Sequence, residues 1–384
     1  MKVLHLSSEY PPAKVYGLGR FVHGLARAQA AQGDEVFVLT NSTGGEEDDV
    51  VQDGVRLHRI AFPNPPRPPE GHGEVLQFNH GLLSRYFDRR ADFAGVEVVA
   101  SHAWLTALAA REIAADLGAP LVVTFHDEVV GKSFGVLSRE AAFVRSLEAL
   151  TARDATHVIA NSRFIAKQVA SHYGVLHERV TAVPGGIDPA LLATRADHRT
   201  ADFRSALLAE DELLVVYVGR LDAEKGLETL ADAFLEAAHA RSELRLVIAG
   251  TGREEAALRA RLAPLEDRVR FLGYVAGDVL SHLYRAADVV LVPSAYEPFG
   301  LVALEAMLGG AAVLVADAGG LPEIVRHERD GLVVPAGDAG SLADALVRLA
   351  VVPELRERLG EAGCERARED FSWSEIARRT REVY

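Results

Sequence analysis

The sequence predicts an α/β protein built from two doubly wound, parallel-sheet halves that face a cleft. Short runs rich in Val, Leu and Ile alternate with longer amphipathic stretches along almost the whole chain. This rhythm breaks once, around residues 183–189, and then restarts. A chain of 384 residues is also too long for one ordinary hydrophobic core. We therefore predict one domain over residues 1–188 and a second over residues 189–370.

The expected strands are runs dominated by Val, Leu and Ile with little alternation of polar residues, which indicates that helices cover both faces of each sheet. In the first half they are Lys2–Leu6, Glu35–Leu39, Val96–Ala100, Pro120–Phe125 and His157–Ala160, with a first helix from about residue 20 to 32. In the second half they are Leu213–Val218, Arg245–Ala249, Val269–Phe271, Val289–Val292 and Ala312–Val315. The proline-rich residues 63–69 are expected to form a surface loop.

Composition narrows the class of protein. The formal net charge of −14 argues against a partner that is a nucleic acid. Cys364 is the only cysteine, so disulfides are excluded and a reducing, cytoplasmic location fits. No apolar run approaches the roughly 18 residues that span a bilayer, and the first residues read as mature protein rather than a signal peptide. Membrane contact is not expected, although local contact stays open.

The most informative stretch, residues 296–305, follows an expected strand and opens a helix. Its two carboxylates, Glu297 and Glu305, stand eight positions apart, with Glu305 expected about two turns into the helix. Between them, the backbone N–H groups of Phe299, Gly300 and Leu301 are free donors suited to an anion or to hydroxyl groups. The alternative from spacing alone is an ordinary capped helix with a solvated acidic face.

A second stretch, residues 218–226, follows a buried strand and precedes a helix. Arg220 and Lys225 could converge there on a diphosphate, with bidentate contacts from the arginine and a point charge from the lysine. The alternative is a solvated loop with a surface ion pair between Asp222 and Arg220. No Asp-x-Asp and no cluster with metal-ligand spacing occurs, so we expect no metal and no cofactor.

Polar and aromatic residues also follow strands of the first half. Gly17 and Gly19 lie between the first strand and the first helix, where they would let the backbone approach a phosphate. His126 ends a strand and could hydrogen bond to a sugar hydroxyl or share a proton; a structural histidine is the alternative. His102, Trp104 and Tyr16 are the candidates for the acceptor side, although core packing explains Trp104 as well.

Taken in this order, these stretches resemble glycosyltransferase family 4, with a likeness to bacterial and archaeal glycogen synthases. The resemblance covers nearly the whole chain and is most specific in Glu297 to Glu305 and in Gly219-Arg220 to Lys225-Gly226. Supporting segments are residues 8–12, 272–273, 319–325 and 330–334. It implies a GT-B fold with two Rossmann-like domains, the first for the acceptor and the second for the donor. It also implies that residues 371–384 form a helix that returns to the first domain.

The family assigns roles residue by residue. Arg220 and Lys225 would hold the diphosphate of a UDP-, ADP- or GDP-sugar, and Glu305 would bind the ribose hydroxyls. Glu297 would meet the transferred hexose together with the N–H groups of residues 299–301. Gly17 and Gly19 match the loop that closes over the phosphates, and His126 matches the histidine near the sugar. Tyr16 departs from the family, because many members have glycine there.

The mechanism implied is metal-independent, front-face transfer of a hexose, glucose by preference, to a hydroxyl of a saccharide or another acceptor, with retention at the anomeric carbon. Other functions stay open on the same architecture: a nucleotide-sugar epimerase, a phosphorylase or a non-catalytic nucleotide-sugar-binding protein. A nicotinamide-dependent oxidoreductase is disfavoured, because Val22 and Glu255 stand where a dinucleotide fingerprint needs its third glycine.

Overall fold

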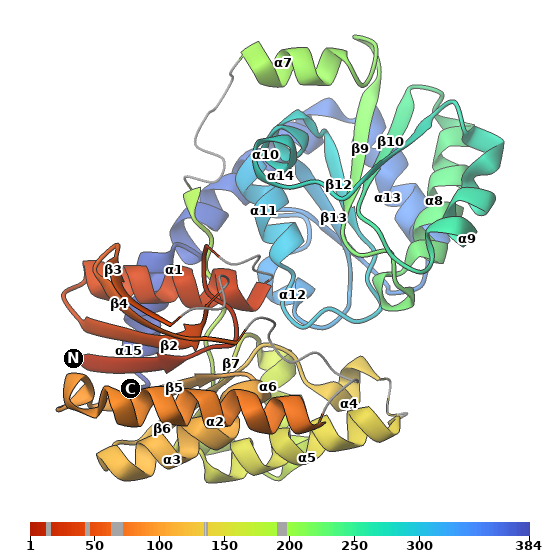
Figure 1. Cartoon of the computed structure of the whole chain (residues 1–384). Helices are drawn as coiled ribbons and strands as arrows, with labels where there is room; N and C mark the ends of the chain where they lie inside the picture. Colours follow the sequence, from red (N-terminus) through yellow and green to blue (C-terminus); the bar gives the residue numbers. More distant parts are fainter. Residues whose placement is uncertain (13–16, 43–46, 63–71, 134, 136, 190–197) are drawn as a thin grey trace. The chain divides into compact units, whose positions relative to one another are not determined.

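The structure is a computed structural model that describes residues 1–12, 17–42, 47–62, 72–133, 135, 137–189 and 198–384. The chain forms two compact units, each an α/β domain on a mainly parallel sheet, as the apolar runs predict (Figure 1). Unit 1 contains residues 1–186 and 373–384, and unit 2 contains residues 187–372. The proline-rich residues 63–69 lie outside the described part of the chain.

The sheet of unit 1 has the strand order β3-β4-β2-β1-β5-β6-β7-β8, and only β3 runs antiparallel to its neighbour. The strands are β1 (Lys2–Leu6), β2 (Glu35–Asn41), β3 (Asp48–Gln52), β4 (Val55–Ile60), β5 (Val98–His102), β6 (Leu121–Phe125), β7 (His157–Ala160) and β8 (Val180–Ala182). Three of these strands, β3, β4 and β8, were not predicted from the sequence. β3 is an exposed edge strand, polar residues interrupt β4, and β8 has three residues.

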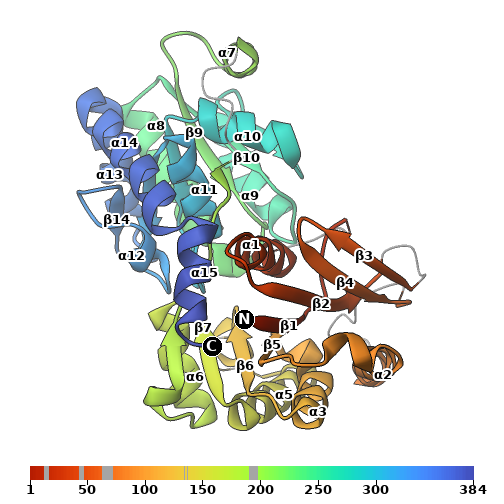
Figure 2. The same ribbon diagram turned by 90° about the vertical axis from the view of Figure 1, so that its left-hand side faces the viewer.

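Helices cover both faces of this sheet, and the last one comes from the end of the chain. They are α1 (Gly17–Ala31), α2 (His72–Asp88), α3 (Ala107–Leu117), α4 (Val129–Lys132), α5 (Arg139–Asp154), α6 (Arg163–Tyr173) and α15 (Trp373–Arg381). α15 packs against α1, where an added Cβ on Gly24 would overlap the Trp373 ring (Figure 2). The ammonium of Met1 and the guanidinium of Arg381 both bind Asp34, at 3.0 and 3.2 Å.

The sheet of unit 2 has the order β11-β10-β9-β12-β13-β14, and its paired strands are parallel. The strands are β9 (Leu213–Val218), β10 (Leu244–Ala249), β11 (Val269–Gly273), β12 (Val289–Val292), β13 (Ala312–Ala316) and β14 (Leu332–Val334). The helices are α7 (His198–Ser205), α8 (Leu227–Ala240), α9 (Glu255–Leu262), α10 (Gly277–Ala286), α11 (Leu301–Gly309), α12 (Leu321–Ile324), α13 (Ala339–Val351) and α14 (Pro353–Asp370).

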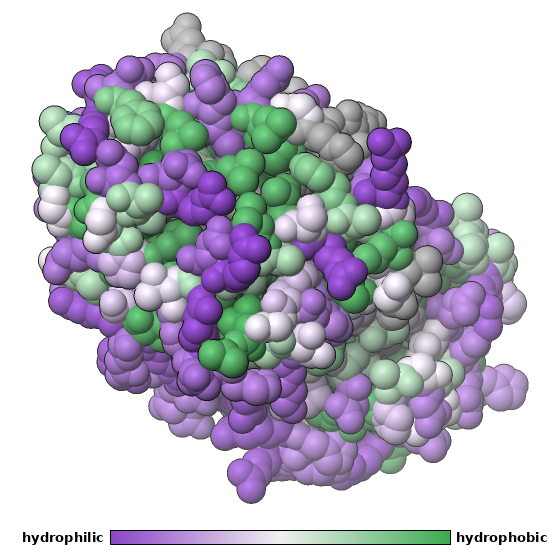
Figure 3. All heavy atoms as spheres, turned by 90° about the horizontal axis from the view of Figure 1, so that it is seen from below, coloured by the Kyte–Doolittle hydropathy of each residue, from purple (hydrophilic) through white to green (hydrophobic). Residues whose placement is uncertain are grey.

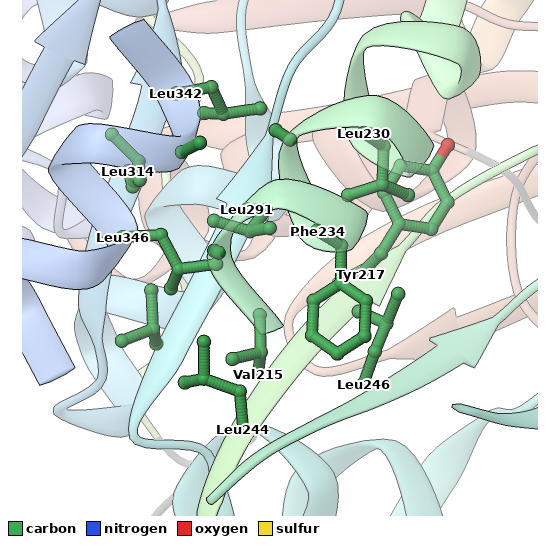
Figure 4. Packing of buried hydrophobic residues seen from close by; sticks show 14 of the residues in the cluster. Val215, Tyr217, Leu230, Phe234, Leu244, Leu246, Leu291, Leu314, Leu342 and Leu346 are labelled. Atoms are coloured by element: carbon green, nitrogen blue, oxygen red, sulfur yellow. The ribbon is translucent and has the colours of Figure 1, made fainter. Parts of the chain in front are cut away.

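One core of unit 2 lies between its sheet and the helices α8 and α13 (Figure 4). Phe234 and Leu230 of α8 and Leu346 of α13 meet strand residues such as Val215, and all four are fully buried. Truncating a buried phenylalanine to alanine costs about 3–5 kcal/mol. This packing makes the strands a rigid base for the loops that leave them.

In both units the first strand lies inside the sheet, and the order reverses beside it. The reversal falls between β1 and β5 in unit 1 and between β9 and β12 in unit 2. Open α/β sheets bind ligands at the carboxyl ends of the strands at such switch points. A ligand site is therefore expected at these two positions.

Apolar side chains also reach the surface. On the face shown in Figure 3 they form patches between polar residues. Large exposed examples include Leu76 and Phe87 of α2 and Tyr274 of unit 2. None of the helices in the described part of the chain is long and apolar enough to cross a membrane.

Candidate active site

Two loops of unit 2 are tied together at its switch point. The loop after β9 contains Arg220 and Lys225, and the loop after β12 contains Glu297. The backbone N–H of Ala295 donates to the carbonyl of Glu224 at 2.9 Å. Gly226 has a φ of +68°, and an added Cβ there would collide with the carbonyl of Pro293. Glycine at this position therefore permits the close approach of the two loops.

Lys225 and Glu297 form an ion pair between these loops. The Lys225 ammonium donates to Glu297 Oε2 at 2.9 Å, and the two side chains are 17% and 15% exposed. The hydroxyl of Ser294 donates to the same oxygen at 3.2 Å. The structure thus brings together one residue predicted for the diphosphate and one predicted for the sugar.

Arg220 has a different environment, because 57% of its side chain is exposed. Its guanidinium contacts the carboxylates of Asp222 and Glu224. The surface pair between Asp222 and Arg220, which the sequence left open as an alternative, is therefore present. An exposed pair of this kind contributes about 1 kcal/mol or less, so an anion can displace its carboxylates readily.

The start of α11 is shaped by the loop that follows β13. Gly300 adopts a φ of +112°, and an added Cβ would lie 2.7 Å from the Leu321 side chain. The N–H of Gly320 donates to the carbonyl of Glu297 at 2.8 Å. α11 begins at Leu301, so the N–H groups of residues 299–301 lie at a helix start, where no intrahelical acceptor is available.

Glu305 is the fifth residue of α11, so it lies about one turn into the helix and not two. Its side chain is buried, and its Oε2 accepts a hydrogen bond from the Tyr284 hydroxyl of α10 at 2.8 Å. This bond fixes the orientation of the carboxylate. The predicted contact with ribose hydroxyls would be made by this oriented carboxylate.

In unit 1, Gly17 and Gly19 lie in the first turn of α1, after β1. An added Cβ on Gly17 would meet no described atom within 4 Å, so packing of the described residues does not explain the glycine. The N–H of Gly19 donates to Glu9 Oε2 at 3.3 Å. A phosphate at this helix start would therefore have to compete with a carboxylate. Tyr16 lies outside the described residues.

The unit 1 switch point holds a buried group of histidines. His102, at the end of β5, contacts His5 of β1, with 2.9 Å between His102 Nε2 and His5 Nδ1. The ring of His126 lies 5.7 Å from that of His102 and packs edge-on against Phe21 at 4.5 Å. Burial lowers the pKa of His126 to about 4 and that of His5 to about 4, and it lowers the pKa of His102 well below its ordinary value. These rings are neutral at pH 7.

The tautomers follow from the hydrogen bonds. His5 Nε2 lies 2.8 Å from the side-chain amide oxygen Oε1 of Gln29, so this nitrogen donates. His5 Nδ1 must then accept from His102 Nε2, which leaves His102 Nδ1 as an acceptor. His102 Nδ1 and His126 Nε2 are buried and have no hydrogen-bond partner among the described residues. Each of these two nitrogens therefore has a hydrogen-bonding position that the described residues do not use.

A residue with a strained backbone, Ala103, lies between His102 and Trp104. Ala103 has φ 63° and ψ 176°, a conformation that is normal for glycine only. Trp104 then begins a 3₁₀ turn, Trp104–Thr106, and is half-buried.

Several residues at these sites were not predicted from the sequence. These residues contact predicted site residues but were not singled out, although two of them lie in the named segments 218–226 and 8–12: Glu224, Ser294, Tyr284, Glu9 and His5. His5 could have been noticed, because a histidine inside an apolar strand needs a buried partner. Among the residues that the structure describes, no group of three or more His, Cys, Asp or Glu side chains could hold a metal ion.

Comparison with known proteins gives consistent results. Residues 15–191 match the model of Glycosyltransferase Family 4, and residues 198–366 match that of Glycosyl transferases group 1. A protein named glycogen synthase from Mycobacterium tuberculosis is 31% identical over 409 residues, which cover 100% of this chain and 94% of that protein.

Solved structures share the architecture. Sucrose-phosphate synthase from Thermosynechococcus elongatus has a TM-score of 0.81 and 29% identity, with 100% of this chain and 98% of that chain covered. HepE from Anabaena, solved in complex with UDP-glucose, has a TM-score of 0.76 and 21% identity, with 100% and 99% covered. These similarities assign the two units to the GT-B architecture.

Proposed function

The chain belongs to the family 4 glycosyltransferases, and we propose that it transfers a hexosyl group, glucosyl by preference, from a nucleotide diphosphate sugar to a hydroxyl group of a saccharide. The observation that carries this proposal is the junction of the two unit 2 loops. There the Lys225 ammonium and the Glu297 carboxylate lie 2.9 Å apart at the switch point. A cation for a phosphate and an acceptor for sugar hydroxyls are thus adjacent.

The charges suit a leaving diphosphate. When the bond between the anomeric carbon and the phosphate oxygen breaks, negative charge develops on that oxygen. Lys225 and Arg220 would neutralise this charge, and the helix start at residues 299–301 would add backbone donors. We propose that Arg220 exchanges its contacts with Asp222 and Glu224 for phosphate oxygens when the donor binds. No divalent cation is needed in this scheme.

Retention follows the family mechanism. The acceptor hydroxyl attacks the face from which the diphosphate leaves, and its proton passes to the departing phosphate oxygen. His126 would donate or accept a hydrogen bond at the sugar as a neutral imidazole, because burial lowers its pKa to about 4. It would not act as a cationic acid at neutral pH.

The donor and acceptor classes are supported by the relatives' names. HepE was solved with UDP-glucose, which favours UDP-glucose as the first donor to test, before ADP- and GDP-sugars. The relatives named glycogen synthase and sucrose-phosphate synthase favour a saccharide acceptor. The lone Cys364, buried in α14, favours a reducing cytoplasmic location.

A donor-by-acceptor array tests the proposal. UDP-, ADP- and GDP-glucose are each incubated with glucans, simple glycosides, sugar phosphates, polyols and lipid extracts, and products are detected by mass spectrometry. We expect transfer to a saccharide, with unchanged rates in EDTA. A rate that collapses in EDTA and returns with Mg²⁺ would contradict metal independence. Donor binding without any turnover would favour a binding protein, and a changed free sugar nucleotide would favour an epimerase.

A further inference from the structure

Two buried carboxyl groups of unit 1 contact the backbone of the segment that carries His126, and one of them belongs to that segment. Glu128 follows β6 and Glu148 belongs to α5, and their side chains are among the buried charged groups, at 0% and 2% exposure. The hydroxyl of Tyr173, from α6, lies 3.3 Å from Glu128 Oε2 and also contacts Glu148 Oε2. One phenol therefore bridges two acidic side chains in the interior.

Counting protons determines the state of this group. A phenol has one proton, so it can donate to one carboxylate only. Two ionised carboxylates against one buried hydroxyl would leave one contact repulsive, whereas a protonated carboxyl can donate to the phenol oxygen.

The donors around Glu128 show which carboxyl is ionised. Glu128 accepts hydrogen bonds from the N–H groups of Val130, at 2.9 Å, and Gly131, at 2.5 Å. The Nδ1 of His172 lies 3.1 Å from its Oε2. Several donors on one carboxyl favour the ionised form, so Glu128 is the carboxylate and Glu148 carries the proton. Burial, aided by Asp127 and Glu128, raises the pKa of Glu148 to about 8.

We propose that Glu128 and Glu148 form a carboxylate and carboxylic acid pair, bridged by Tyr173, that positions the His126 segment and loosens it in alkaline solution. The link from this pair to sugar transfer rests on the function proposed above. The pair itself depends only on the contacts within unit 1.

The contacts show how the pair holds the segment. Glu148 Oε2 accepts from the N–H of Val129 at 3.1 Å, and the Glu128 side chain caps the start of α4. An added Cβ on Gly131 would collide with Glu128 Oε1, so the cap depends on glycine at that position. The carbonyl of His126 accepts from Asn161 Nδ2 at 2.6 Å. Residues 126–131 are thus fixed at both ends.

The groups that face the pair set the sign of the pH effect. Asp127, which pairs with Lys132 at 3.2 Å, and Glu128 oppose ionisation of Glu148, whereas the hydrogen bond from the Tyr173 hydroxyl favours it; burial outweighs that bond. His172 faces Glu128. The folded-state pKa of Glu148 lies above the value of about 4.3 expected in the unfolded chain. Protonated Glu148 therefore makes its full contribution to the free energy of unfolding below about pH 4.3. This contribution is lost as the pH rises through 8. Above that pH, two buried carboxylates repel each other beside α4.

The variant Glu148→Gln tests this proposal, because an amide keeps the shape and the hydrogen-bonding groups but cannot ionise. We expect kcat/KM of the parent to fall by up to about tenfold per pH unit above pH 8. Glu148→Gln should keep at least about half of the parent activity at pH 7 and lose much less at pH 9.5. The exposed Glu112 of α3, changed to Gln, is the matched control and should retain the alkaline fall.

A second measurement does not require activity. The urea midpoint of the parent should decrease between pH 6 and pH 9 more than that of Glu148→Gln. Superimposable midpoint profiles would overturn the pair, whether or not transfer activity is found. The parent and Glu148→Gln could also differ in their midpoint profiles and yet show the same alkaline fall in kcat/KM. That result would overturn the role of the pair in positioning the His126 segment. Tyr173→Phe, which removes the bridge, should shift the same alkaline fall to a different pH, and an unchanged profile would contradict the bridge.

Discussion

The carboxyl edges of the two sheets carry different chemistry on the same topology. In unit 2 the switch point is ionic, with Lys225 bound to Glu297 and Arg220 bound to two carboxylates. In unit 1 it is neutral, with stacked histidines whose pKa values burial lowers. Paired charges can exchange partners with an anion, whereas neutral rings can only exchange hydrogen bonds. The difference supports the proposal that unit 2 would bind the anionic part of the donor and that unit 1 would bind uncharged hydroxyl groups.

Removing a positively charged side chain from the unit 2 site should lower kcat/KM more than any other change predicted below. Lys225→Ala and Arg220→Ala should each lower kcat/KM about 10²-fold or more, because a charge-assisted contact to a leaving diphosphate is lost. The effect of Lys225→Ala should be the larger, since it also leaves the carboxylate of Glu297 unpaired in a mostly buried position. Steady-state kinetics with UDP-glucose and an accepted saccharide measure both.

The exposed Arg259 of α9 offers a matched control, because it pairs with Glu255 outside the candidate site. Arg259→Ala should change kcat/KM by less than about twofold. Near-parental turnover in Lys225→Ala, or an equal loss in Arg259→Ala, would remove the charge argument for unit 2.

The two glutamates of unit 2 should separate binding from chemistry. Glu305→Ala should weaken binding of free UDP by about tenfold, because one hydrogen bond to a charged group is lost. Glu297→Ala should instead lower kcat, since this carboxylate lies beside the reacting sugar in the proposal. Isothermal titration calorimetry and kinetics distinguish these effects. Unchanged UDP affinity in Glu305→Ala would contradict its role in ribose recognition.

The strands were predictable where burial leaves an apolar run. Lys2–Leu6 and Leu213–Val218 have the predicted bounds, because both faces of these strands are covered. β4 was missed because His58 and Arg59 are buried in it as polar residues. Their partners, Asp49 and Asp48, come from β3, so the burial depends on another strand. A local pattern cannot show such a partner.

The candidate site likewise has features that could be predicted from the sequence and features that could not. The sequence suggests Lys225 and Glu297 as chemical groups, but their contact spans 72 positions and depends on the pairing of β9 with β12. The local pair between Asp222 and Arg220 was open as an alternative from the sequence, whereas the bond that orients Glu305, from Tyr284, was not predictable. Residue types and local ion pairs were predictable from the motifs, whereas contacts between distant segments depend on the tertiary structure.

Because the histidines of unit 1 are neutral, changing one of them should affect kcat/KM less than removing a cation from unit 2. The effect should also be independent of pH. His126→Asn should lower kcat/KM by about tenfold through the loss of a well-placed hydrogen bond. The ratio of parent to variant should stay constant from pH 5.5 to 8, because a pKa of about 4 leaves the imidazole neutral throughout. A ratio that changes several-fold between pH 6 and 7 would show an ordinary histidine and remove the contrast between the units.

The smallest effect concerns the backbone of unit 1. Ala103, with φ 63° and ψ 176°, occupies a conformation that costs a residue other than glycine about 1–3 kcal/mol. Ala103→Gly should relieve this strain and raise the free energy of unfolding by about 1 kcal/mol, after the entropy that glycine adds to the unfolded chain is subtracted. The exposed Ala115 of α3 is the control, because the same change within a helix should lower stability by about 0.5–1 kcal/mol. Urea unfolding measures both variants. If Ala103→Gly is stabilised but loses activity, the strained residue positions His102 or Trp104 for the acceptor. If it is destabilised like Ala115→Gly, the strain is absent and the neutral edge of unit 1 is a relaxed surface.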